Sequence, residues 1–378
     1  MKNGKRQLLP FPEIPEELAW FATRFSIDPI HRILRSRNSQ VKYYLYKNIF
    51  NMDQTSLHLK VSKRALNENK SRIKILKELE LFDHSSYFLD YPPEERKILQ
   101  LNYLVSLLSE ALDYNCHKRM YVIQNALIHI LKHQKEDGSF PLPLHLNAHL
   151  VETLLKYNFE GNRFVEQAIR WLVRQQNEDG GWGNAQNGSD IWVTVKVLSA
   201  CSYHSIIQER SKVKRGAEYI LSHYLSENKG GILEGIQAWD NLSYGYDGIK
   251  SFRGGTLKVL EVLADLGYTT ENKMIRKMLT WLENQQNAYG LWSALPRQAK
   301  DITDEWVSYR VIRVLQEYYL LFNNRRPIRK YKIKPGGRTS AKKPYFLIES
   351  KNNHDEFFDD NDNSLKTTIK NKEIINES

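Results

Sequence analysis

The sequence of 378 residues contains only two cysteines, Cys116 and Cys201, and no long apolar run. A membrane-spanning helix needs about 18 or more consecutive apolar residues, so none is expected. The segment from Leu8 to Pro12 is too short and too rich in proline to be the apolar region of a signal peptide. With no export signal, we expect both thiols to be reduced and the protein to be cytoplasmic.

The excess of basic residues is concentrated near the C-terminal end. The formal net charge is +11, and nine lysines and arginines lie between Arg325 and Lys343. The composition from Asn352 onward, rich in Asn, Asp, Lys and Ser, cannot bury a core. We therefore interpret 324–378 as a disordered tail, first basic and then rich in Asn and Asp. No second motif for nucleic acid accompanies the basic run, so no nucleic-acid partner is expected.

The most informative stretch runs from Val165 to Ala200. It begins with apolar residues at helical spacing, which predicts an amphipathic helix. Gln176 to Trp182 (QNEDGGW) is a turn with two glycines followed by a large aromatic residue. A polar loop then leads to Asp190, which is suited to cap a second, apolar helix. The unit is therefore a helix, a Gly-Trp turn and a capped helix.

This unit recurs along the chain. Seven positions between Trp171 and Trp182 match seven between Trp281 and Trp292 at one constant offset. An earlier copy, QKEDGSF, ends at Phe140 in place of the tryptophan, and a degenerate copy ends in two glycines without an aromatic residue. Repeats at such spacing indicate stacked supersecondary units.

These turns resemble the QW-type repeats of the terpenoid cyclase and protein prenyltransferase superfamily, which includes squalene cyclase. The match covers roughly residues 120–320. The resemblance implies an all-α fold, an α/α toroid of about six helix pairs without sheet. It also implies that the Gln and Trp of each turn clamp the outer helices, here Gln176 with Trp182 and Gln286 with Trp292.

The repeats divide the chain into three parts. We expect an N-terminal arm over 1–15, the toroid over 16–323 and the tail over 324–378. The repeats are clearest over 119–322.

The resemblance directs attention to the starts of the inner helices. Class II terpenoid cyclases protonate an alkene or epoxide there, with the central Asp of a D-x-D-D-T-A motif in a dry, aromatic-walled cavity. In this chain Asp190 is kept, but Trp192 occupies the position of the acid. Asp304 and Trp306 repeat this departure, so both aspartates are better interpreted as helix N-caps. The first copy places His149 at the acid's position, although an imidazolium is a weak acid towards an alkene.

The candidate acids are few. The repeats and one long loop offer only the following: His149, Asp190, Asp247 and Asp304.

The zinc site of the prenyltransferase branch is also missing. Those enzymes hold Zn²⁺ with Asp, Cys and His, and their Asp-x-Cys step is absent here. Asp113, Cys116 and His117 have the right residue types, but they lie outside the start of an inner helix. We interpret them as a chance cluster, and Cys201 as a small buried apolar residue. No metal and no cofactor are predicted.

One segment interrupts the repeats. Between Gly231 and Thr256 the connection is longer than its equivalents and rich in aromatic residues. Long ordered loops in compact domains are often functional, so this loop is expected to line or cover a cavity. A rim loop that packs on its own helices is the alternative. The residues expected at a ligand cavity are Trp192, Trp239, Tyr244, Tyr246, Arg253, Trp306 and Tyr309.

Two functions remain open. The first is an enzyme that handles an isoprenoid, a cyclase or prenyltransferase with a non-standard acid. The second is a non-catalytic binding or scaffold protein whose cavity or rim takes a hydrophobic small molecule, a lipid or a peptide. The missing acid dyad and zinc ligands favour the second, whereas the repeats and the aromatic loop favour the first. The sequence specifies neither the ligand nor the oligomeric state.

Overall fold

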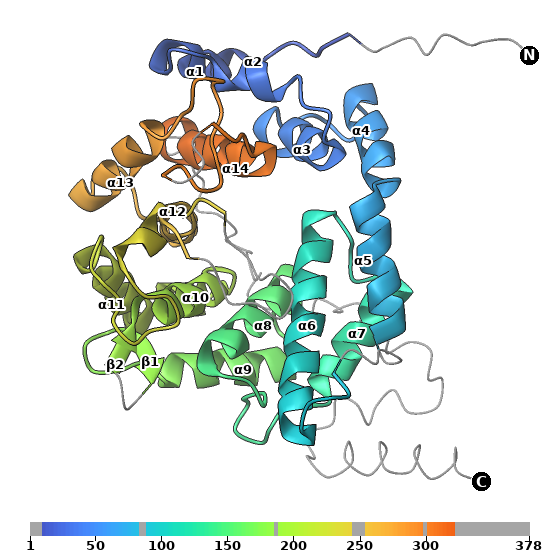
Figure 1. Ribbon diagram of the computed structural model, residues 1–378, viewed down its shortest axis with the longest axis vertical. Helices are drawn as coiled ribbons and strands as arrows, with labels where there is room; N and C mark the ends of the chain where they lie inside the picture. The colour runs from blue at the N-terminus through green and yellow to red at the C-terminus, as the bar shows by residue number, and fades with distance from the viewer. Residues whose placement is uncertain (1–9, 83–87, 185–187, 244–253, 298–300, 322–378) are drawn as a thin grey trace, which may run out of the picture. The chain divides into compact units, whose positions relative to one another are not determined.

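A computed structural model describes residues 10–82, 88–184, 188–243, 254–297 and 301–321 (Figure 1). Within these ranges the chain forms 14 α-helices. None of the described helices is long and apolar enough to cross a membrane. The C-terminal tail and most of the N-terminal arm lie outside the described residues. The protein is therefore all-α, as the sequence predicts.

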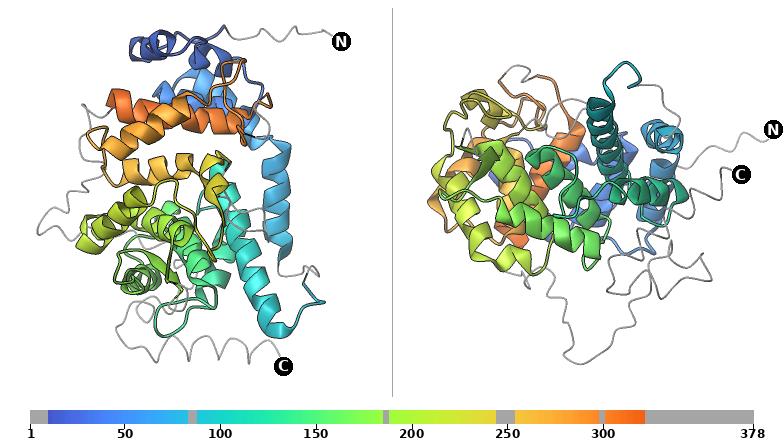
Figure 2. Two further views of the ribbon diagram at one scale, coloured as in Figure 1. Left: turned by 60° about the vertical axis from the view of Figure 1, so that its left-hand side comes forward. Right: turned by 90° about the horizontal axis from the view of Figure 1, so that it is seen from below.

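The helices form two concentric layers. From α6 to α14, and from α14 to α3, each inner helix packs on the next, and each outer helix packs on an inner one. Successive inner helices lie side by side in chain order, from green α8 to orange α14 (Figures 1 and 2). The inner helices are α3 (Ser39–Tyr44), α6 (Pro93–Asp113), α8 (Leu144–Lys156), α10 (Ile191–Ser202), α12 (Thr256–Asp265) and α14 (Glu305–Gln316). The outer helices are α2 (Pro29–Ile33), α4 (Leu57–Asn67), α7 (Tyr121–Leu131), α9 (Arg163–Arg174), α11 (Ser211–Ser222) and α13 (Lys273–Glu283).

The remaining elements are short or peripheral. Helix α1 precedes α2, and helix α5 packs on α6 and α7. Their bounds, with those of the shorter turns, are α1 (Ala19–Arg24), α5 (Lys70–Leu81), η1 (Glu16–Leu18), η2 (Leu45–Ile49), η4 (Ile207–Glu209), η5 (Ile236–Asp240) and η6 (Glu317–Leu321).

Residues from the two ends of the ring meet and close it. Helix α14 packs on both α2 and α3. On the other side of α3, Gln40 Nε2 donates a hydrogen bond to the Asp113 carbonyl oxygen at 3.1 Å. Tyr44 Oη donates to the Leu112 carbonyl oxygen at 2.9 Å. Both carbonyls belong to the last turn of α6, so the six inner helices form a closed ring, an α/α toroid.

Inner and outer helices differ in how much of their surface is buried. In α9 only one stripe is buried, formed by Val165, Ala168, Ile169, Leu172 and Val173. In α10 every residue from Ile191 to Cys201 is buried. A helix that is covered on all sides must be apolar almost throughout, whereas an outer helix keeps a polar face for solvent. The sequence pattern therefore assigns each helix to its layer.

The expectation of a fold without sheet is wrong in one detail. Strands β1 (Trp182–Asn184) and β2 (Gly188–Asp190) form an antiparallel ribbon, in which Trp182 pairs with Asp190. The described residues on either side of 185–187 pair their backbone groups with one another. The ribbon is an elaboration of this repeat's turn and leaves the helical ring unchanged.

Candidate ligand site inside the ring

A cavity of about 450 Å³ lies among the inner helices, and all six of them contribute to its lining. Six acidic and four basic side chains from the described residues line it: Glu110, Asp113, Glu152, Glu261, Asp265 and Glu317, with Lys156, Lys196, Arg310 and Arg313. The lining is therefore much more charged than the dry, aromatic-walled cavity of a class II cyclase. An inner helix is surrounded by other helices, so the cavity is where its charged side chains can contact water. Burying a charge in the apolar packing instead would be costly.

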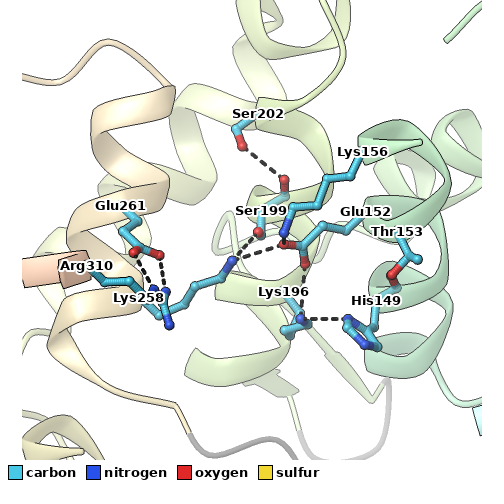
Figure 3. Close-up of polar contacts among 10 residues, drawn as sticks. All are labelled: His149, Glu152, Thr153, Lys156, Lys196, Ser199, Ser202, Lys258, Glu261 and Arg310. Atoms are coloured by element: carbon cyan, nitrogen blue, oxygen red, sulfur yellow. Dashed lines mark hydrogen bonds and ion pairs between the residues drawn. The ribbon is translucent and has the colours of Figure 1, made fainter. Parts of the chain in front are cut away.

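The centre of the site is Glu152 of α8, which is surrounded by three lysines (Figure 3). Lys156 Nζ lies 2.7 Å from Oε1, and Lys258 Nζ of α12 lies 3.0 Å from the same oxygen. Lys196 Nζ of α10 lies 3.0 Å from Oε2. We call these four residues the lysine cluster. It joins three neighbouring inner helices and places three ammonium groups against one carboxylate.

Two further contacts complete the lysine cluster. Lys196 Nζ also donates to Nδ1 of His149 at 3.1 Å, and Lys258 Nζ donates to Oγ of Ser199 at 2.7 Å. The side chains of Lys196 and Lys258 are only 3% and 4% exposed. Neither lysine is therefore a solvated surface charge.

Burial and charge act in opposite directions on the pKa values of the cluster. Burial alone would raise the pKa of Glu152, but the three ammonium groups hold it well below its usual value. Burial lowers the pKa of Lys196 to about 7, although Glu152 opposes this shift. Burial and the adjacent Lys196 lower the pKa of His149 well below its usual value. His149 is thus neutral at pH 7 and is a hydrogen-bond acceptor for Lys196.

A second group of charged residues lies on α6, α12 and α14. Arg310 binds Glu261 through both carboxylate oxygens, at 3.0 Å from Nε and 2.5 Å from Nη2. Asp113 is accessible to solvent at the cavity, but its position inside the ring raises its pKa, against an opposing influence of Arg310. Enclosure likewise raises the pKa of Asp265, which Arg313 opposes. The cavity therefore holds carboxyl groups that retain a proton more readily than exposed ones.

One side of the cavity is aromatic. Trp306 and Tyr309 of α14 stack with their ring centroids 5.0 Å apart. Tyr44 of α3 lies against Trp306 at 5.5 Å, and Asn48 donates a hydrogen bond to Tyr309 Oη at 2.7 Å. We call Tyr44, Trp306 and Tyr309 the aromatic wall. Such a surface can bind apolar carbon or the face of a cation.

The candidate acids are in different places. His149 lines the cavity. Asp190 caps α10 by accepting bonds from the backbone N–H groups of Trp192 and Val193, and Asp304 caps α14 by accepting from Val307 N–H. Asp247 lies outside the described residues. Among the candidates that the structure describes, only His149 therefore contacts the cavity, and it is held neutral.

The predicted ligand-cavity residues are divided in the same way. Trp306 and Tyr309 line the cavity. Trp192 is fully buried against Trp239 of η5, with centroids 4.8 Å apart, and neither residue is part of the lining. Trp192 belongs to a helix that is covered on all sides, so its indole fills space between elements instead of the ring's interior. The rest of this set lies outside the described residues: Tyr244, Tyr246 and Arg253.

The Gln and Trp of each repeat connect one outer helix to the next. Gln176 Nε2, after α9, donates to the carbonyl oxygen of Lys212 in α11 at 2.7 Å. Gln286 Nε2, after α13, donates to the carbonyl oxygen of Ile27, just before α2, at 2.9 Å. Trp182 and Trp292 are fully buried. Each indole Nε1 donates to the preceding outer helix, at Leu172 and Leu282 respectively.

Neither cysteine is placed as a metal ligand. No group of three or more His, Cys, Asp or Glu side chains in the described part of the chain is arranged to hold a metal ion. Cys116 and Cys201 are both buried, and burial raises the pKa of the Cys201 thiol to about 12. Asp113, from the same stretch as Cys116, lines the cavity instead. Metal ions bind the thiolate, which burial disfavours at both positions.

Sequence reasoning missed the lysine cluster. Its members lie in otherwise apolar segments: Glu152 and Lys156 in LVETLLK, Lys196 in IWVTVKVLSA and Lys258 in TLKVLEVLAD. A charged residue within a helix that reads as buried on all sides is the signal that identifies them. Such residues are rarely buried unless they are paired. The charged residues that line the cavity therefore lie within the inner helices more than at their N-terminal ends.

Comparisons with known proteins give limited information. No protein-family model and no curated protein matches the chain. Among solved structures, the type II terpene cyclase MstE from Scytonema in its apo form aligns at 12% identity and a TM-score of 0.41, over 80% of this chain and 98% of that one. A variant of that cyclase in complex with merosterolic acid A aligns at 12% identity and a TM-score of 0.35, over 80% and 96%. Likenesses at these scores add nothing to the helix contacts that define the toroid.

Proposed function

We propose that the ring binds an amphiphilic organic anion in its cavity, with an isoprenoid phosphate or carboxylate as the ligand class. The lysine cluster receives the anionic head, and the aromatic wall receives the apolar part. The proposal keeps the isoprenoid ligand that the repeats imply and adds a charged head group.

The observation that carries the proposal is the charge of the lysine cluster. Three lysine side chains meet within 3.0 Å of one carboxylate in a largely desolvated place. An anion that enters the cavity can add to the charge contacts at the point where these three helices meet. A lysine also binds phosphate well as a point charge.

The aromatic wall supports the apolar part of the ligand. Tyr44, Trp306 and Tyr309 line the α3 and α14 side of the same cavity. The rest of the lining is mostly charged. A ligand that is apolar throughout would make no charge contact with this lining, so the charged head is part of the proposal.

Proton transfer in the cavity is a second candidate function, favoured by Asp113. Its carboxyl has a raised pKa, and burial, together with the nearby Asp113, raises the pKa of the Tyr44 phenol. A protonated carboxylic acid beside an aromatic surface can donate a proton to an epoxide or alkene. In this candidate Asp113 takes the role that the motif positions of the inner helices lack.

Three ligands test the binding proposal by calorimetric titration: farnesyl phosphate, farnesol and inorganic phosphate. Farnesyl phosphate should bind more tightly than either part alone. Lys156→Met and Lys196→Met should each weaken its binding at least ~10-fold, because both lysines line the cavity and a charge contact is lost. Lys118→Met is the matched control, since Lys118 donates to the Asn158 carbonyl oxygen on the outside of the ring. Equal affinity for farnesol and farnesyl phosphate, unaffected by the variants, would overturn the proposal.

The same preparations test proton transfer. Squalene, oxidosqualene and farnesyl phosphate are incubated with the protein, and the extract is examined by mass spectrometry. A cyclised product that Asp113→Asn abolishes, while farnesyl phosphate still binds, assigns the acid. Binding without any product leaves the ring as a binding protein.

A further inference from the structure

A pair of histidines on outer helix α7 has not been assigned any role. His129 and His133 lie four residues apart, so their side chains project from the same face of the helix. Their Nε2 atoms are 3.3 Å apart, and their ring centroids are 5.0 Å apart. Both residues are partly buried. The edge of Phe82, at the end of α5, packs on His129 with centroids 4.6 Å apart.

The separation of the two nitrogens fits a shared metal ion. Zinc–nitrogen bonds are about 2.0–2.1 Å long, and two ligands at the tetrahedral angle are then about 3.3–3.4 Å apart. The same separation is within reach of a weak hydrogen bond, which links the two rings when no metal ion is bound. Two histidines spaced i and i+4 on a helix are also the arrangement that binds zinc in helical metalloprotease motifs.

We propose that His129 and His133 form a two-histidine site for a divalent transition-metal ion, with water completing its coordination. Imidazole suits Zn²⁺, Cu²⁺ and Ni²⁺, so these ions are the chemical class. The ion would bridge two successive turns of α7 next to Phe82, where α5 packs on α7. Its role is structural, because the pair lies on the outer layer and is not part of the cavity lining.

The experiment uses the full-length protein after chelator treatment, with Co²⁺ and Zn²⁺ as probes. Co²⁺ should give the visible absorption bands of tetrahedral coordination, which a hydrogen-bonded histidine pair cannot produce. Added Zn²⁺ should remove these bands by competition. Zn²⁺ should also raise the melting temperature of the wild-type protein, since a ligand that binds only the native state stabilises it.

Two variants and one control make the assignment specific. His129→Ala and His133→Ala should each weaken Zn²⁺ binding at least ~10-fold, the effect of losing one of two protein ligands. His58→Ala is the control, because the His58 ring already bonds the Pro10 carbonyl oxygen away from α7. Circular dichroism verifies that each variant is folded. The proposal is overturned if the wild type shows no tetrahedral Co²⁺ spectrum, or if both α7 variants keep wild-type affinity.

Discussion

Replacing Glu152 by Gln tests whether the lysine cluster holds the ring together. The amide has nearly the volume of the carboxylate, so the substitution removes a charge and leaves no cavity. It leaves Lys156, Lys196 and Lys258 without their common anion, all within 3.0 Å of the lost charge. Glu261, another carboxylate of the cavity, is bound by Arg310.

The expected cost is about 3–5 kcal/mol of unfolding free energy, the usual effect of removing one partner of a buried ion pair. Glu152 interacts with three cations, so a value near the top of that range is expected. The sign of the pH effect follows from the pKa. Because the pKa of Glu152 is depressed, the wild-type contribution is present above about pH 4.5 and is lost as pH falls through the native pKa.

Urea denaturation followed by far-ultraviolet circular dichroism measures the change. Glu227→Gln is the control, because Glu227 pairs with Lys229 at 3.6 Å and both side chains are well exposed; it should leave the midpoint unchanged. Adding Lys196→Met to Glu152→Gln removes one excess ammonium, so the double variant should be more stable than Glu152→Gln alone. A loss below about 1 kcal/mol in Glu152→Gln would refute the view that the cluster is electrostatically coupled.

Two further predictions concern the repeats. Trp182→Ala and Trp292→Ala should each lower the unfolding free energy by about 3–5 kcal/mol, because each removes a fully buried aromatic side chain. A loss in the urea denaturation assay no larger than that of a Phe→Leu substitution would contradict this. Asp304→Ala should cost about 1 kcal/mol, the value of a lost cap. Asp190→Ala should cost more in the same denaturation assay, because Asp190 also accepts a hydrogen bond from the backbone N–H of Ile232 at 2.6 Å. Equal losses in the two cap variants would show that this extra bond contributes nothing.

The ring was predictable because the local signals agree with the tertiary contacts. The spacing of Gln176 and Trp182 recurs at Gln286 and Trp292, and a repeated unit must bury its apolar face on a neighbour. The partner of the last repeat was not predictable. Gln286 bonds the carbonyl of Ile27, which no repeat motif marks, so the closing contact depends on the path of the whole chain.

The chemistry of the cavity was less predictable, for a physical reason. Motif comparison points to the helix starts, where Asp190 and Asp304 satisfy backbone N–H groups. The cavity is instead defined by charges in the middle and at the ends of the inner helices, among them Asp113 and Lys196. Which helical positions face the lumen depends on the rotation of each helix about its axis, and a helix with no solvent face gives no amphipathic pattern from which to read that rotation.

The pH dependence of ligand binding links this buried lysine to the proposed function. Burial lowers the pKa of Lys196 to about 7, so the empty cavity loses an ammonium group as pH rises through that value. A bound anion favours the charged form and raises the pKa again. Affinity for an anion should therefore fall between about pH 6.5 and 9, by at most ~10-fold per pH unit for one coupled proton. Farnesoic acid is a suitable probe, because a carboxylate keeps a constant charge over this range.

The Lys196→Met variant separates this effect from other groups. Burial raises the pKa of Glu261 to about 8, although its bond to Arg310 favours the ionised carboxylate, so ionisation of Glu261 is the alternative cause of weaker anion binding in this range. If Lys196 is the group responsible, the affinity of the variant for farnesoic acid is low and nearly independent of pH. If the slope persists in Lys196→Met and disappears in Glu261→Gln, the titrating group is Glu261. In that case the anion is bound near Arg310, and the lysine cluster has only a structural role.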